Sequence, residues 1–464
     1  MKPSVFVFAG LALACSEPSK PEAAAQVDPW SAVQLARAID TNPDPKVVEI
    51  ALTAKVATHQ YPNSEPSEVW TYNGTVPGPL IEANVGDELV VHFENQLPEP
   101  TTIHWHGIRL PAQMDGTLAM QAPIPPGGSF EYRFVLKDAG LFWFHPHIRS
   151  DVQIEKGLYG TLLVRGAEEP KVDREAVFVL DDVRVLPDGT FPDYLDDLSK
   201  MMGRQGNVLL VNGTSLPTLP VRRGAVHRLR LVNVANGRFF NLALPGHSFR
   251  VIGTDGGLLP RPYDTDRLLL SPGERYDLLL VPGGAPGQLT LTNEPYERGH
   301  DSAKEPPLPM AVFQLSEDEP LSPQPLPTAF SSIERLPASA VDHTLNLSEA
   351  FDADGQLVFT INGVTHPDVP KISVTNGAIR VFDVLNESDM DHPFHLHGFF
   401  FQTLEEDGIA VLPEALANKD TRIIRAHGSA RIVARFDEPG AWMYHCHILE
   451  HAEGGMMGEV NVLP

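Results

Sequence analysis

Histidine clusters are the features of this sequence whose residue types and spacing could do chemistry. Ten of the eighteen histidines fall in four short clusters, which are His104-Trp105-His106, His145-Pro146-His147, His392-Pro393-Phe394-His395-Leu396-His397, and His445-Cys446-His447 followed by His451. Histidines two residues apart on a β-strand point to the same face, where both imidazoles can bind one metal ion. A single pair of this kind is often structural, but four pairs in one chain predict metal binding.

The second chemical signal is the cysteine inside the last cluster. The sequence has two cysteines, Cys15 and Cys446, so no disulfide framework is expected. Because side chains alternate along a strand, the Cys446 thiol should face away from the two histidines beside it. A thiolate with imidazoles and a weak thioether is the ligand set of an electron-transferring copper site. The candidates for this set are Cys446, His392, His451 and Met456.

The remaining eight clustered imidazoles suit a multinuclear metal site. They are His104, His106, His145, His147, His395, His397, His445 and His447. Four come from the first third of the chain and four from the last third. The sequence therefore predicts a site that lies between two distant parts of the chain.

Three copies of one unit explain how these clusters are positioned. Each copy has an Asn-Gly pair, then a glycine that opens a strand pattern, then an asparagine nine residues later. These positions are Asn73, Gly86 and Asn95; Asn212, Gly224 and Asn233; and Asn362, Gly377 and Asn386. Polar and apolar residues alternate in the strand patterns, as in half-buried antiparallel strands. We expect an all-β chain of three consecutive β-sandwich domains, at residues 47–168, 169–335 and 336–464, with a proline-rich linker from Pro306 to Pro337.

Composition supports this architecture and narrows the range of partners. The 464 residues include 43 prolines and 37 glycines, which fits short strands joined by turns. The net charge of −25 argues against binding to nucleic acid or to anionic lipid headgroups, because like charges repel. We expect a monomer with small neutral or cationic partners.

The amino-terminal segment predicts export. Residues 1–14 contain an apolar run that is too short to span a bilayer and fits a signal segment. Residues 15–46 read as a polar leader with one short helix around Ser31 to Ile39. The stretch from Leu11 to Cys15 resembles a bacterial lipobox, so Cys15 is a candidate lipid anchor. The expected location is the periplasm or cell envelope, or the extracellular space, with no membrane span.

The clusters, in this order, resemble those of the multicopper oxidase family, in its three-domain bacterial laccase form. The resemblance covers nearly the whole chain after the leader, and it implies cupredoxin-like Greek-key domains and four copper ions. It implies that Cys446, His392 and His451 bind a type 1 copper with Met456 as axial ligand. His104 and His395 would bind the type 2 copper. The type 3 pair would be bound by His106, His145, His147, His397, His445 and His447.

The resemblance also implies an activity. Such enzymes couple four one-electron oxidations of phenols, aromatic amines or metal ions to the reduction of dioxygen to water. A cuprous oxidase and a non-enzymatic copper store or carrier are the alternatives, although the ten methionines form no methionine-rich tract. A copper nitrite reductase would have no use for eight further imidazoles.

Protons for dioxygen reduction need an acid. Asp115 lies at the family's position for that acid, although Asp115-Gly116 could simply form a tight turn. Related bacterial enzymes often have an acid directly after the second type 1 histidine. Here that residue is Ala452, so a second proton path through Glu450 or Glu453 is left open.

Overall fold

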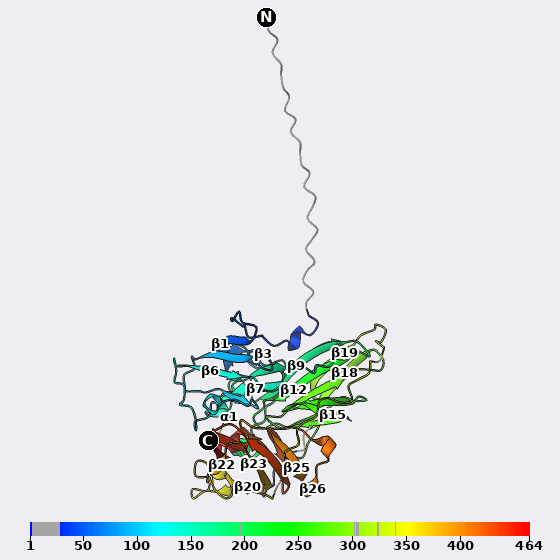
Figure 1. The fold of residues 1–464 in the computed structure, drawn as a ribbon. Coiled ribbons are helices and arrows are strands. Elements are labelled where there is room, and N and C mark those ends of the chain that lie inside the picture. Colours follow the sequence, from blue (N-terminus) through cyan, green and yellow to red (C-terminus); the bar gives the residue numbers. More distant parts are fainter. Residues whose placement is uncertain (2–27, 195, 301, 303–305, 323, 339) are drawn as a thin grey trace.

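The computed structural model describes residue 1 and residues 28–464, except residues 195, 301, 303–305, 323 and 339. The predicted signal segment, Cys15 and the start of the leader therefore lie outside the described residues. Among the described residues, strands dominate the fold and form six sheets, two for each of three successive parts of the chain. This confirms the all-β expectation. In Figure 1 the first and second units lie side by side, and the third unit lies beneath them.

The first unit consists of two four-stranded sheets. Its strands are β1 (Val47–His59), β2 (Ser67–Tyr72), β3 (Leu80–Asn84), β4 (Glu88–Asn95), β5 (His104–His106), β6 (Ser129–Val135), β7 (Gly140–His145) and β8 (Gly160–Arg165). The strand orders are β2-β1-β4-β6 and β3-β8-β7-β5. Buried and exposed residues alternate along β6 and along β4 from Val91 onward, whereas β7 is buried along its whole length. The buried β7 ends at His145, the first histidine of a pair whose second member, His147, follows the strand.

The second unit has a six-stranded and a five-stranded sheet, in the orders β10-β9-β12-β17-β14-β15 and β11-β19-β18-β13-β16. Its strands are β9 (Arg174–Val183), β10 (Val208–Val211), β11 (Thr218–Val221), β12 (His227–Asn233), β13 (Phe240–Ala243), β14 (Phe249–Thr254), β15 (Gly257–Thr265), β16 (Arg267–Leu270), β17 (Arg275–Leu280), β18 (Gly287–Asn293) and β19 (Leu308–Leu315).

The third unit repeats this plan in the orders β21-β20-β23-β28-β25-β26 and β22-β30-β29-β24-β27. Its strands are β20 (His343–Phe351), β21 (Leu357–Ile361), β22 (Ile372–Thr375), β23 (Ala378–Asn386), β24 (His392–Leu396), β25 (Phe401–Glu406), β26 (Ile409–Ala410), β27 (Thr421–Ile424), β28 (Ser429–Phe436), β29 (Gly440–Cys446) and β30 (Met457–Leu463). The domain boundaries at 168 and 335 stay predictions, although each sheet draws its strands from one unit.

Short helices lie in the connections between strands. Those that the described residues form in full are α1 (Ser150–Glu155), α2 (Asp197–Met202) and α3 (Leu449–Glu453), with 3-10 turns at Ser31–Val33, Ala112–Met114 and Pro413–Ala415. Helix α3 contacts both α1 and α2, so elements of all three units meet there. No helix within the described part of the chain is long and apolar enough to cross a membrane.

The repeated asparagines have a structural function. Asn73, Asn212 and Asn362 all have positive φ and precede a positive-φ glycine, as in two-residue hairpin turns. The asparagine at the end of each later strand ties that strand to a neighbouring loop. In the third unit, Asn386 Nδ2 donates to the carbonyls of Met390 at 2.7 Å and Ile424 at 3.0 Å. These two hydrogen bonds hold the loop that leads into the histidines of β24.

The helix expected around Ser31 to Ile39 is wrong beyond its first turn. Only the 3-10 turn Ser31–Val33 forms, and the chain then runs extended beside β3, where the Ala38 N–H donates to the Leu80 carbonyl at 2.9 Å. Trp30 is buried and stacks on His227 of the second unit. Pairing with the first unit and anchoring to the second therefore override the helical pattern.

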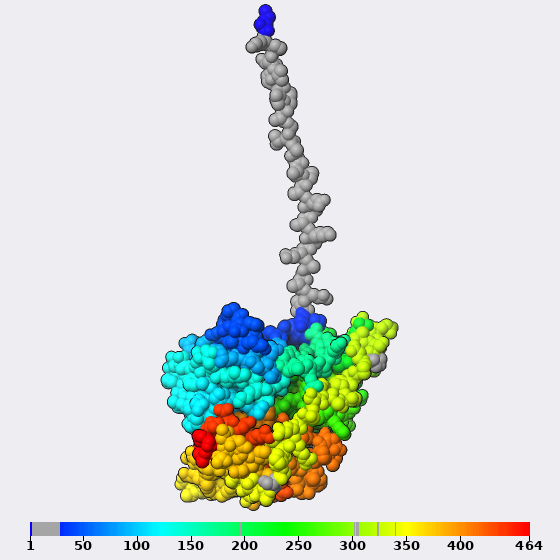
Figure 2. Space-filling model, viewed as in Figure 1, coloured from blue at the N-terminus to red at the C-terminus, as the bar shows by residue number. Residues whose placement is uncertain are grey.

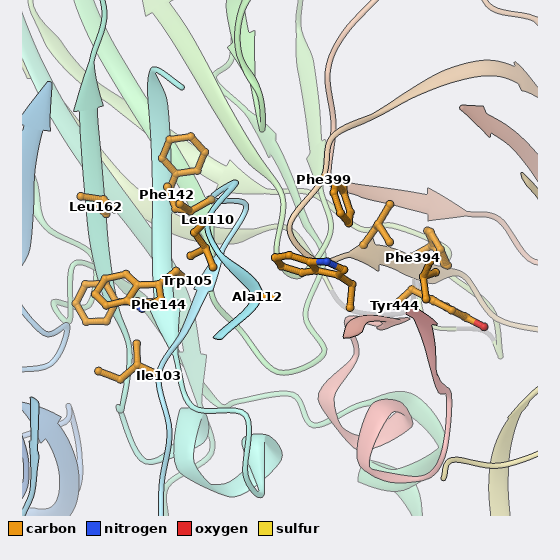
Figure 3. Packing of buried hydrophobic residues seen from close by; sticks show 14 of the residues in the cluster. Ile103, Trp105, Leu110, Ala112, Phe142, Phe144, Leu162, Phe394, Phe399 and Tyr444 are labelled. Atoms are coloured by element: carbon orange, nitrogen blue, oxygen red, sulfur yellow. The ribbon is translucent and has the colours of Figure 1, made fainter. Parts of the chain in front are cut away.

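The largest buried apolar cluster joins the first and third units. Figure 3 shows Ile103, Trp105, Phe142, Phe144 and Leu162 on one side and Phe394, Phe399 and Tyr444 on the other, with Ala112 between them. The surfaces of these two units are continuous in the space-filling view (Figure 2). A shared core of this kind fixes the two units that carry the histidines relative to each other.

Candidate copper centres

Eight imidazoles meet between the first and third units. β5 pairs with β7 so that His104 lies opposite His145, and β24 pairs with β29 so that His395 lies opposite His445. The two strand pairs face each other, and the rings of His106 and His395 stack with centroids 3.8 Å apart. The groups whose ligand atoms all lie within 4.8 Å of one another include His104, His395 and His397; His104, His106 and His145; and His147, His397 and His445. The ring of His447 lies beside them, with its centroid 4.9 Å from that of His106, so all eight predicted cluster histidines are brought together.

The hydrogen bonds of these rings fit a metal ion better than a structural role. The Nδ1 atoms of His145, His395 and His445 lie within 3.0 Å of backbone carbonyls, to which they can donate. The opposite Nε2 atoms of His145 and His395 are buried and have no hydrogen-bond partner among the described residues. An outer acceptor that fixes the tautomer and leaves the other nitrogen free is the usual arrangement of a metal-binding histidine.

Burial also favours the neutral, metal-binding form of the rings. It lowers the pKa of His447 to about 3 and, together with the charge of His104, the pKa of His397 to about 4. A neutral imidazole has a lone pair to give to a cation. The donor set and its orphaned nitrogens therefore fit copper.

A second site lies on the other face of β29. The Cys446 Sγ is 3.4 Å from His392 Nδ1 and 3.8 Å from His451 Nδ1, and the two Nδ1 atoms are 3.2 Å apart. All three side chains are buried. The strand alternation thus separates the thiol from the imidazoles of its two neighbours, as the sequence predicted.

The outer nitrogens of this second site are also held. The Nε2 of His392 lies 2.7 Å from Ser388 Oγ, and the Nε2 of His451 lies 3.1 Å from the carbonyl of Met201 in α2. Helix α2 belongs to the second unit, so the second unit contacts the Nε2 side of the His451 ring. The Nδ1 atoms are left to point at the cysteine.

The two adjacent methionines lie in different surroundings. Met456 is fully buried in the apolar cluster that contains Cys446, and its carbonyl accepts from the Cys446 N–H at 3.1 Å. Met457 is partly buried and lines a cavity near the histidine cluster. These environments support Met456 over Met457 as the thioether of the cysteine site.

Asp115 lies against the histidine cluster rather than in an exposed turn. It is fully buried, with Oδ2 2.9 Å from His397 Nδ1 and Oδ1 3.2 Å from His104 Nδ1. Burial alone would raise the pKa of this carboxyl, but the adjoining His397 and His104 outweigh burial and lower it well below the ordinary value. One carboxylate therefore joins a ring from each terminal unit.

Asp420 and Arg275 are site residues that the sequence reasoning missed. Asp420 Oδ1 lies 3.2 Å from His106 Nε2, and the Arg275 guanidinium binds both Asp420 oxygens, at 2.6 and 2.5 Å. Arg275 begins β17, so the middle unit, which has no histidine cluster, still forms part of the wall. Neither residue belongs to a spaced motif, and only the fold places them here.

The two glutamates near Ala452 occupy different places. Glu450 is buried, and its Oε1 accepts from Asn236 Nδ2 at 2.9 Å. Glu453 Oε1 accepts from the backbone N–H and the hydroxyl of Ser150, both at 2.8 Å. Glu453 also lines a cavity of about 540 Å³ whose wall includes His147 and Met457. Of the two, Glu453 is the one that shares a cavity with a cluster histidine.

Comparison with known proteins identifies the family. Three multicopper oxidase family models match residues 53–169, 190–318 and 338–464. A multicopper oxidase of Mycobacterium tuberculosis is 31% identical over 434 residues, which cover 85% of this chain and 83% of that protein. A laccase of Botryotinia fuckeliana is 28% identical over 85% of this chain and 79% of its own length.

A solved structure gives the same result for the fold. The multicopper oxidase from Campylobacter jejuni, described as a metallo-oxidase, superimposes with a TM-score of 0.81 at 28% identity and covers 93% of this chain and 94% of its own. These matches confirm the cupredoxin-like fold, the copper cofactors with four ions per chain, and the copper-dependent oxidoreductase class. This chain belongs to the multicopper oxidase family.

Proposed function

We propose that this protein is a laccase-type oxidase that takes electrons one at a time from phenols, aromatic amines or metal ions and reduces dioxygen to water. The observation that carries the proposal is the end of β29, where Cys446 faces one buried site while His445 and the following His447 face the other. The path between the sites is a few covalent bonds of one strand. This arrangement suits the transfer of single electrons to a site that needs four.

We propose the following ligands. Cys446, His392 and His451, with Met456 as axial ligand, would hold the type 1 copper. His104 and His395 would hold the type 2 copper. The type 3 pair would be held by His106, His145, His147, His397, His445 and His447. When bound, copper would accept single electrons at the cysteine site and supply the four electrons for dioxygen at the histidine cluster.

The chain itself orients the ligands and excludes water. Backbone carbonyls, Asp115 and Ser388 hold the outer nitrogens of the rings, so the inner nitrogens need no rearrangement to meet a metal ion. Burial of the cluster keeps bulk water away from it, which limits side reactions of reduced oxygen with solvent.

We further propose that Asp115 delivers protons to the reduced oxygen. Its contacts with His104 and His397 place a carboxylate at the edge of the cluster, within reach of a hydrogen-bonded water. Glu453 is the candidate for a second path, because it lines the cavity that reaches His147. Glu450 is the weaker candidate, since its carboxylate faces Asn236.

The reducing substrate would approach the type 1 site at α2. Lys200 and Met201 are partly exposed on this short helix, and Met201 covers His451 by its carbonyl. Two adjacent methionines, Met201 and Met202, keep cuprous ion among the candidate reductants. The chain's similarity to a laccase supports phenols and aromatic amines as substrates, and its similarity to a metallo-oxidase supports metal ions.

Oxygen consumption by the copper-loaded protein tests the function. A laccase-type enzyme consumes one dioxygen for every four molecules of a phenolic dye oxidised. Uptake with cuprous ion but not with the phenol or an aromatic amine would favour the cuprous oxidase. Tight copper binding without uptake from any reductant would favour a copper store and overturn the proposal.

We also propose that the protein acts as an exported monomer, in the periplasm or cell envelope or outside the cell, with a possible lipid anchor at Cys15. The apolar run before Cys15 and the net charge of −25 support export and small partners over nucleic acid. Sedimentation of the exported protein tests the monomer, and mass spectrometry of its amino-terminal peptide tests the anchor.

A further inference from the structure

Arg298 differs from the other buried arginines of the described residues. The buried arginines are Arg204, Arg228, Arg230, Arg238, Arg275 and Arg298. The first five form ion pairs with buried or partly buried carboxylates. Arg298 is 2% exposed, forms no ion pair within the described chain, and its Nε and Nη1 have no hydrogen-bond partner there. An unpaired buried cation lowers the stability of the folded protein, which suggests that Arg298 has a function other than stabilising the fold.

The loop that carries Arg298 is fastened to the type 1 site. The Arg298 carbonyl accepts from the Asp391 N–H at 2.7 Å, and Gly299 forms a bridge with Met390. Asp391 directly precedes the proposed ligand His392. The guanidinium carbon lies 5.6 Å from the centre of the Phe239 ring, and Phe239 belongs to the same buried cluster as Cys446. Arg298 is therefore held beside the site without touching a ligand.

The charge of Arg298 survives burial. Burial and the nearby Arg238 lower the pKa of Arg298 to about 10, so the guanidinium stays protonated at neutral pH. Because Arg298 is almost fully buried, solvent and salt screen its charge less than that of an exposed arginine.

We infer that Arg298 raises the reduction potential of the type 1 copper and so sets which reductants this oxidase can use. The inference rests on the proposed type 1 site. Reduction takes one electron from the substrate and lowers the charge on the copper by one. A fixed cation nearby repels the oxidised form more than the reduced form, and the low-dielectric surroundings strengthen this effect. Arg298 contacts no reacting atom and acts only through its charge.

Redox titration of the blue absorption against a one-electron mediator tests the inference. Arg298→Met keeps an unbranched apolar stem and removes the charge. We expect the equilibrium constant for reduction of the blue site to fall about tenfold, a downward shift of about 59 mV for one electron. Arg298→Lys, measured at pH 6 so that the ammonium stays charged, should recover most of the loss.

Arg425→Gln is the matched control. Arg425 is an exposed arginine of the neighbouring loop and donates to Tyr296 Oη at 3.2 Å, so water and salt screen its charge. Its removal should leave the constant within twofold of the unaltered protein. Unfolding of the copper-free proteins adds a second readout, because loss of an unpaired buried charge should not lower the stability of Arg298→Met.

Two results would overturn the inference alone: a blue Arg298→Met protein with an unchanged constant, or an Arg298→Lys protein shifted as far as the methionine variant. If the constant is unchanged and the stability of Arg298→Met is reduced, Arg298 is a structural residue. An unaltered copper-loaded protein without blue colour would overturn the type 1 assignment, and this inference with it.

Discussion

The thiol of Cys446 is the side chain on which the colour of the loaded protein should depend. It has His392 and His451 as close neighbours, whereas the histidine cluster lies on the other face of the strand. Cys446→Ser removes the thiolate whose charge-transfer band makes such sites blue, so we expect a colourless protein. The cluster keeps its own ligands, and about three of four copper ions per chain should remain by metal analysis. A variant that stays blue would show that the type 1 site is elsewhere.

Asp115 is the residue whose substitution should separate electron transfer from proton transfer. Asp115→Asn keeps the size of the side chain but cannot pass on a proton. The blue colour and the reduction by substrate should survive, because Asp115 lies at the cluster and not at Cys446. Reoxidation of the fully reduced protein by dioxygen should slow by about 10²-fold or more in stopped-flow mixing.

The contacts of Asp115 call for a control, because the carboxylate also orients His104 and His397. An asparagine accepts from one ring and presents a donor to the other. Copper content and the solvent deuterium isotope effect on reoxidation separate the two functions. Full copper content with a larger isotope effect supports proton delivery. Reoxidation at the unaltered rate would leave Asp115 as a structural residue and direct attention to Glu453.

At the scale of elements, the turn before β17 brings the middle unit into the cluster. Gly273 has φ +86°, and a Cβ there would lie 2.9 Å from His447 Cδ2 and 3.1 Å from His106 Cε1. Gly273→Ala should therefore displace these rings. We expect lower copper content in the cluster and slower reoxidation, with the blue colour retained.

Gly284→Ala is the control for this turn. Gly284 has φ +97° but nothing within 4 Å of an added Cβ, so alanine there carries backbone strain of about 1 kcal/mol without crowding. Equal copper loss in both variants would mean that strain in the second unit, rather than contact with the histidines, explains the effect.

Strand periodicity explains why so much of the site could be predicted from the sequence. The pairs at β5, β7, β24 and β29 are visible because a period of two puts both histidines on one face, and Cys446 on the other. Asp420 and Arg275 escaped notice because each is a single residue on a different unit, and their ion pair exists only after the units dock. The helix predicted in the leader was wrong because the chain there pairs with β3 instead, a contact that local pattern does not encode.

For the whole molecule, bound copper should stabilise the docking of the first unit on the third. Each half of the cluster belongs to a different terminal unit, so ions bound there stabilise the docked state and not the unfolded chain. A ligand that binds only the folded state adds about 2.7 kcal/mol when its concentration is 100-fold above Kd. Calorimetry should therefore show a lower Tm after removal of copper by a chelator, and recovery after reloading.

The cysteine variant provides the control for this effect. Copper-loaded Cys446→Ser should keep most of the gain in Tm, because the ions between the units do not depend on the thiol. A loaded blue protein with the same Tm as the copper-free protein would contradict the prediction and show that apolar packing alone holds the units together.

The division of the cluster between residues 104–147 and 395–447 also governs when the chemistry can begin. A chain still emerging from the ribosome or the export channel, or one cut by a protease in the middle unit and pulled apart, has at most half of the imidazoles. Incomplete reduction of dioxygen releases damaging oxygen species, and half of the imidazoles cannot form the complete cluster, whose groups include histidines of both terminal units. Because the histidines are divided between the two terminal units, only the fully synthesised and docked chain can form the complete cluster and react with oxygen.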